Sequence, residues 1–142
     1  MGDVEKVKRM VASCIRKFGT TDPFAIADQL GVLYQIGNLK CDGCYMFLKN
    51  HRYIFLSSAL NHQELLLVMA HELGHALLHT EPINHFDVTT KNVHTNVEYE
   101  ANLFAVALLC NEDEFNMPLA KMSNAVLKSI LDCNVSYGQG EK

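Results

Sequence analysis

The sequence predicts an α+β fold: a mainly helical single domain with a small antiparallel β-sheet in front of its central helix. Apolar residues recur at helical spacing near the start of the chain and again from residue 62 onward. Between these regions, residues 32–57 contain short runs rich in β-branched and aromatic residues, which are typical of strands. The 142 residues contain no internal repeat, and they suffice for one core of ordinary size. We therefore expect one domain over residues 1–142.

Two helices are predicted before the sheet. Residues 3–18 place apolar side chains at helical spacing with charged residues between them. The segment TTDPFAIADQLGV predicts a second, short helix. Asp22 can cap its start, Pro23 suits its first position and Gly31 suits its end.

Three strands are predicted for the sheet. The segments VLYQIG and CYMFLK give the first two, and Tyr53–Ser57 gives the third. A polar turn of three residues, Asn50–Arg52, separates the second strand from the third. Because Tyr53–Ser57 directly precedes the central helix, its edge is a candidate for binding an extended peptide as an added strand.

The central helix is predicted over residues 62–79. Asn61 and Glu64 form a capping-box pattern at its start, and Pro82 follows its end.

The second half of the chain predicts a loop and two more helices. Residues 81–95 lack periodicity and are long for a loop. Apolar spacing predicts helices over about 96–110 and 118–133, and we expect residues 134–142 to form a flexible tail.

Composition excludes several classes of protein. The formal net charge is −4 and the 12 basic residues are scattered, so we expect no direct binding to nucleic acid, which requires clustered Lys and Arg. The start, MGDVEKVKRM, is too charged for a signal peptide. Apolar runs are too short to span a bilayer, so we expect no membrane partner.

The cysteines predict a reducing compartment. Five cysteines cannot all pair within one chain, and an odd count without an export signal fits reduced thiols in the cytoplasm. Cys41 and Cys44 form a lone CxxC pattern around Asp-Gly, which is a turn signal. We interpret them as free thiols at the entry to a hairpin.

The segment HELGH in the central helix carries the pattern of a zinc site. His71 and His75 are four residues apart, so a helix places them on one face, where both imidazoles can reach one cation. Glu72 lies beside them, positioned to take a proton from a water molecule at the metal. Gly74 is costly in a helix by about 1 kcal/mol, which indicates a closely packed neighbouring backbone.

Two histidines leave a catalytic zinc site one protein ligand short. The candidates for the third ligand are His79, His85, His94, Glu98 and Glu100. On an ideal helix His79 lies two turns from His71, about 12 Å along the axis, too far for one ion to bind both. We expect a supporting or core role for His79.

Glu98 is the preferred third ligand. Asn102 follows it by one helical turn, where its amide oxygen can accept the free ring N–H of a ligating histidine. Glu100 points to nearly the opposite side of the same helix and is the alternative to Glu98. With Glu98 as the ligand, we expect Glu100 to be exposed or salt-bridged. The residue one turn after Glu100 is Phe104, which offers no such acceptor.

The pair HELGHALLH and EYEANLFAVALL resembles the ImmA/IrrE family of zinc metallopeptidases, which share the gluzincin active-site plan and a zincin-like core. The resemblance covers about residues 20–115 and implies one Zn²⁺ bound by His71, His75 and Glu98, with Glu72 as general base. Many members have Met-Pro where this chain has Cys110-Asn111. The chain ends soon after this core, which resembles the short type from phages and mobile elements.

The resemblance also implies a partner. Such proteins cleave a helix-turn-helix transcriptional repressor, so we expect a zinc endopeptidase with a narrow protein substrate. The alternative is a non-catalytic anti-repressor that retains zinc and sequesters the regulator. Peptide hydrolysis further requires a donor to the tetrahedral oxyanion, for which Tyr99, His94 and His85 are candidates.

Overall fold

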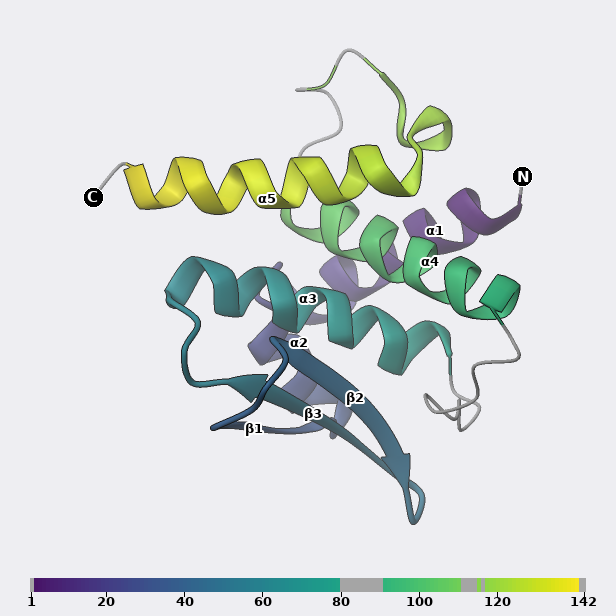
Figure 1. Ribbon diagram of the computed structural model, residues 1–142. Helices are drawn as coiled ribbons and strands as arrows, with labels where there is room; N and C mark the ends of the chain where they lie inside the picture. Colours follow the sequence, from purple (N-terminus) through teal and green to yellow (C-terminus); the bar gives the residue numbers. More distant parts are fainter. Residues whose placement is uncertain (1, 80–90, 111–114, 116, 141–142) are drawn as a thin grey trace.

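The computed structural model describes the backbone of residues 2–79, 91–110, 115 and 117–140, and the side chains of these residues except 2–3, 91–96 and 133–140 (Figure 1). The helices are α1 (Gly2–Phe18), α2 (Pro23–Leu30), α3 (His62–Leu78), α4 (Lys91–Leu109) and α5 (Asn124–Gly140), with a 3₁₀ turn η2 (Leu119–Lys121). The strands are β1 (Leu33–Gly37), β2 (Gly43–Leu48) and β3 (His51–Ser57). The predicted α+β class is confirmed.

The predicted caps of α2 and α3 are formed. The Asp22 side chain accepts from the backbone N–H of Phe24 at 2.9 Å, and Gly31 ends α2 with φ of 77°, in the left-handed region. At α3, Asn61 and Glu64 each accept a hydrogen bond from the other's backbone N–H at 2.8 Å. Local sequence therefore determines where α3 begins.

The sheet is mixed, so the prediction of an entirely antiparallel sheet is wrong for β1. The strand order is β1-β3-β2; β2 pairs antiparallel with β3, whereas β1 pairs parallel with it. Residues 38–42 carry the chain past the end of β3 to its other side. The backbone N–H of Ser58 donates to the carbonyl of Gly37, and that of Ser57 donates to the carbonyl of Asp42.

The hairpin and its edge also differ from expectation. Lys49 and Asn50 both have positive φ, 51° and 65°, as a two-residue hairpin turn requires, and His51 already belongs to β3. The predicted three-residue turn is therefore wrong. Because β3 has a strand on each side, its edge cannot receive a peptide, and β2 is the edge strand next to the pocket described below.

The helix α3 lies between the sheet and α4, and α5 lies across these helices on the side away from the sheet (Figure 1). Fully buried side chains from each layer fill the core, including Ile26, Ile54, Leu73 and Phe104. This packing places one face of α3 against α4, where the predicted ligands lie.

The bounds of the later helices differ from the predicted ones. α4 begins at Lys91 rather than near 96. α5 begins only at Asn124, because Pro118 is extended, a 3₁₀ turn follows it, and the Ser123 hydroxyl caps the backbone N–H of Val126. The helix then continues to Gly140, beyond the predicted end near 133.

Part of the predicted loop, residues 80–90, lies outside the described residues. A search of the described helices for membrane spans finds none that combines the necessary length and apolar character.

Candidate metal centre

Close packing of α3 on α4 builds the site. A Cβ added at Gly74 would lie 2.9 Å from the Cβ of Phe104 and 3.3 Å from the Cα of Ala101. A side chain at this position would therefore push the two helices apart. This bears out the expectation that a neighbouring backbone requires glycine at position 74.

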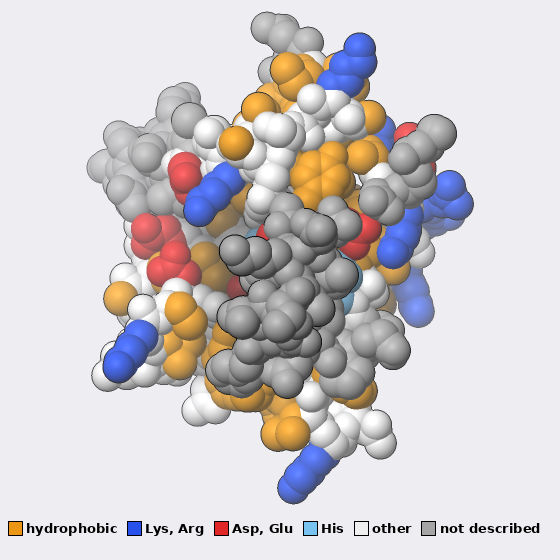
Figure 2. Space-filling model, turned by 45° about the vertical axis from the view of Figure 1, so that its right-hand side comes forward, with side chains coloured by type: hydrophobic (Ala, Val, Ile, Leu, Met, Phe, Trp, Pro, Cys, Tyr) orange, Lys and Arg blue, Asp and Glu red, His pale blue; other side chains and the backbone are white. Residues whose placement is uncertain are grey.

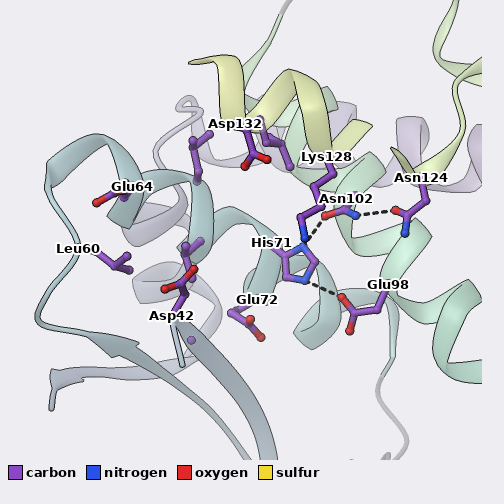
Figure 3. Close-up of a pocket in the computed structure, with 14 residues that line it drawn as sticks. Asp42, Leu60, Glu64, His71, Glu72, Glu98, Asn102, Asn124, Lys128 and Asp132 are labelled. Atoms are coloured by element: carbon purple, nitrogen blue, oxygen red, sulfur yellow. Dashed lines mark hydrogen bonds and ion pairs between the residues drawn. The ribbon is translucent and has the colours of Figure 1, made fainter. Parts of the chain in front are cut away.

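His71, His75 and Glu98 converge at this contact. One ligand atom from each lies within 4.8 Å of the others. Nε2 of His71 is 3.0 Å from one carboxylate oxygen of Glu98 (Figure 3). Nε2 of His75 is 3.3 Å from the other oxygen. These separations are close to the edge of about 3.4 Å in a tetrahedron of zinc ligands with bonds of about 2.1 Å.

Asn102 determines which nitrogen of His71 is protonated. Its Oδ1 lies 2.8 Å from Nδ1 of His71, and its Nδ2 donates to Oδ1 of Asn124 at 2.6 Å (Figure 3). An amide oxygen only accepts, so Nδ1 of His71 carries the proton. In a neutral imidazole this leaves a lone pair on Nε2, directed at the carboxylate of Glu98.

Two acceptors that face each other need a cation or a proton between them. The neighbouring imidazoles of His71 and His75 outweigh burial and hold the pKa of Glu98 below its usual range, so it is ionised. Burial lowers the pKa of His75, which keeps this ring neutral. Burial alone would lower the pKa of His71, but the hydrogen bond to Glu98 and nearby carboxylates raise it. An ionised carboxylate with two imidazoles fits a divalent cation.

Glu72 lies next to these three residues, but its carboxylate is not part of the group of ligand atoms that converge. Its side chain is 8% exposed, and it lines the same pocket as His71 and Glu98 (Figure 3). Burial raises the pKa of Glu72 to about 7, with the charge of Glu98 adding to the effect and that of His71 opposing it.

A pocket of about 650 Å³ opens over the site. The pocket is bounded by the start of β2 and by α3, α4 and α5. The residues that line it are Asp42, Gly43, Leu60, Glu64, Leu67, Val68, His71, Glu72, Glu98, Asn102, Asn124, Lys128, Leu131 and Asp132. Figure 2 shows acidic side chains gathered beside hydrophobic ones on one face of the molecule. The mixture of apolar and polar walls suits a peptide.

Glu98 and Glu100 both contact histidines of the α3 segment, but different ones. Glu100 is buried and its carboxylate lies 2.8 Å from Nε2 of His79, so of the two settings predicted for it, exposed or paired, it has the paired one. His79 is not one of the three converging residues; it caps α3 with φ −124° and ψ 73°, outside the helical region.

Of the three predicted oxyanion donors, Tyr99 is the one whose side chain the structure describes, and it does not line the pocket. The Tyr99 hydroxyl donates to the carbonyl of Met122 at 3.3 Å. His85 lies outside the described residues, and so does the side chain of His94.

Cys41 and Cys44 are free thiols at the entry to β2, as predicted. Burial, followed by the neighbouring Cys41 and Glu72, raises the pKa of Cys44.

Two residues that line the pocket, Asn124 and Lys128, belong to no recognisable sequence motif. Asn124 and Lys128 lie one turn apart on α5 and face the site from the side opposite β2 (Figure 3). The apolar spacing of this helix identifies its buried side, but nothing in it indicates that its polar side meets α4.

Residues 27–128 match the family model of peptidase M78, described as the IrrE N-terminal-like domain. "Uncharacterized immunity region protein 2" of Bacillus phage phi105 is 36% identical over 112 residues, covering 76% of this chain and 70% of that protein. "Metallopeptidase ImmA" of Bacillus subtilis (strain 168) is 30% identical over 118 residues, covering 80% of this chain and 68% of that protein. The match to the family spans more than half of the chain, and the resemblance seen in the two motifs is confirmed. The chain belongs to the M78, or ImmA/IrrE, family of metallopeptidases.

Proposed function

We propose that this chain is a cytoplasmic, zinc-dependent endopeptidase that cleaves a helix-turn-helix transcriptional repressor. The observation that carries the proposal is the convergence of His71 Nε2, His75 Nε2 and ionised Glu98, with Glu72 beside them on the same pocket. Membership of a metallopeptidase family supports peptide hydrolysis. The immunity region protein of a phage, among the relatives, supports a regulatory substrate encoded with mobile elements.

Two imidazoles and one carboxylate are a donor set that zinc favours in catalytic sites, with a further position left open. We assign one Zn²⁺ to His71, His75 and Glu98. When bound, the ion would acidify a water molecule and polarise the scissile carbonyl. Asn102 holds the ring of His71 in the tautomer that presents Nε2 to the ion.

Glu72 supplies the proton transfers. Its carboxylate accepts the proton of the attacking water and returns it to the amine of the leaving peptide. Glu72 directly follows His71 on α3 and lines the pocket, but it is not one of the three residues assigned to the ion.

Lys128 is our candidate for stabilising the oxyanion that forms at the scissile carbonyl. Among the described residues that line the pocket, it is the one lysine, and there is no arginine. The side chain extends from α5 toward the pocket (Figure 3). A cation at this position would favour the negative charge that develops as water attacks.

The decisive experiment incubates the purified protein, loaded with zinc, with the helix-turn-helix repressor encoded beside it. Glu72→Gln is expected to retain zinc and to lose cleavage, whereas Asp132→Asn, which removes an exposed carboxylate from the same pocket, retains both. Cleavage by Glu72→Gln would refute the assignment of the base. Repressor binding without cleavage by the wild type would favour the alternative, a zinc-containing anti-repressor that sequesters the regulator.

A further inference from the structure

A line of buried contacts leads away from the proposed metal site along the side of His75 that faces away from Glu98. Nδ1 of His75 lies 3.2 Å from Nδ1 of His79, and the two rings are 5.3 Å apart. Nε2 of His79 lies 2.8 Å from the carboxylate of Glu100. The side chains of His75, His79 and Glu100 are 3%, 8% and 11% exposed, so water has little access to these contacts.

The direction of each hydrogen bond follows from the end of this line. A carboxylate only accepts, so Nε2 of His79 donates to Glu100. The two Nδ1 atoms of His75 and His79 face each other, so one must donate and the other accept; with Nδ1–H of His75 as the donor, Nδ1 of His79 accepts. His75 is left with a lone pair on Nε2, the nitrogen that faces Glu98 at 3.3 Å.

We propose that His79 and Glu100 are positioning residues that hold His75 in its metal-binding tautomer and orientation. The inference rests on the proposed metal site. The arrangement parallels that of His71, which Asn102 holds in the same tautomer through Nδ1. If His79 donated from Nδ1 instead, His75 would carry its proton on Nε2 and could not bind a metal there.

The position of His79 explains why this role requires a residue at the end of the helix. His79 is the C-cap of α3 and its backbone is outside the helical region. Its ring can therefore reach Nδ1 of His75 and the carboxylate of Glu100 on α4 at the same time. Outer partners of this kind change metal affinity by about 10- to 100-fold when they are removed.

Two substitutions separate the hydrogen bond from packing. His79→Phe keeps a ring of similar size but removes both nitrogens. His79→Asn places an amide oxygen near the position of Nδ1, where it can accept from His75. The measurement is zinc affinity by competition with a chromophoric chelator, together with the unfolding midpoint of the metal-free protein and the visible spectrum of the Co²⁺-loaded protein.

We expect His79→Phe to bind zinc about 10- to 100-fold more weakly than the wild type, and His79→Asn to recover most of that loss. The Co²⁺ spectrum should change for the Phe variant and resemble the wild type for the Asn variant. Wild-type zinc affinity in His79→Phe, or equal losses in both variants, would overturn the inference.

Glu100→Gln tests the far end of the line if His79→Phe does not fold. It keeps the side-chain shape but removes the charge that orients His79, and we expect weaker zinc binding and an altered Co²⁺ spectrum. Unchanged affinity and spectrum would contradict the proposal. A wild type that binds no zinc would instead overturn the proposed function, because the inference concerns only differences between variants and a zinc-binding wild type.

A nuclear magnetic resonance spectrum of the zinc-loaded wild type with ¹⁵N-labelled histidine gives an independent test. It reports which ring nitrogen of each histidine carries a proton. We expect His79 to be protonated on Nε2 alone. A proton on Nδ1 of His79 would reverse the line of hydrogen bonds and overturn the inference.

Discussion

Replacing Gly74 by alanine tests whether the spacing of α3 and α4 is fixed by their close contact. The added Cβ would lie 2.9 Å from the Cβ of Phe104, whereas ordinary contacts of this kind begin at 3.4 Å. Phe104 cannot yield by changing its rotamer, because its Cβ is fixed by the backbone, and the side chain is fully buried. The two helices would have to separate by about half an ångström.

The two opposing effects of Gly74→Ala can be estimated. Alanine favours the helix by about 1 kcal/mol relative to glycine. Overpacking of a well-filled interior costs about 1–3 kcal/mol. Because the crowded atoms belong to the backbone or are fixed by it, we take the upper half of that cost and expect the free energy of unfolding to fall by about 1–2 kcal/mol, which lowers the melting temperature by about 4 °C for each kcal/mol in a chain of this length.

Urea denaturation of the metal-free protein, monitored by circular dichroism, measures this change. The control is Gly37→Ala, since nothing lies within 4 Å of a Cβ at that position and its φ is not positive. We expect the control to stay within about 0.5 kcal/mol of the wild type. Zinc affinity should also fall in Gly74→Ala, because α4 carries Glu98. A Gly74→Ala variant as stable as the wild type would refute the argument from helix spacing.

Two further predictions concern the pocket and the start of α3. Lys128→Met should lower kcat for repressor cleavage by about 10²- to 10³-fold with zinc content unchanged. The control Lys121→Met, on the nearby 3₁₀ turn, should have no such effect. A kcat for Lys128→Met equal to that of the wild type would exclude Lys128 as the oxyanion donor. Asn61→Ala should lower the free energy of unfolding by about 1 kcal/mol without changing the affinity of the folded protein for zinc, and an unchanged urea midpoint would show that the capping box contributes nothing.

The features that the sequence predicted well are those with local causes. The caps at Asp22, Gly31 and Asn61 depend on residues within a few positions of one another. The juxtaposition of His71 and His75 follows from the period of one helix. A glycine inside a helix indicates a closely packed neighbour, so the close contact at Gly74 could also be predicted. The sequence does not show that Phe104 is this neighbour.

The features that the sequence missed depend on how elements meet. The parallel pairing of β1 cannot be read from its composition, because the same apolar residues suit either direction; the crossing of residues 38–42 past β3 decides it. Asn124 likewise gains its role only because the start of α5 lies against Asn102. The contact between His79 and Glu100 likewise depends on how the end of α3 meets α4.

The site depends on the register between α3 and α4. Glu98 meets His71 and His75, and one turn later Asn102 meets His71. A sliding of one helix along the other would break these contacts together, because Glu98 and Asn102 are carried by the same helix, α4. Two motifs separated in the sequence therefore act as one unit once Gly74 allows the helices to touch. It follows that a substitution far from the ligands can weaken metal binding if it shifts this register.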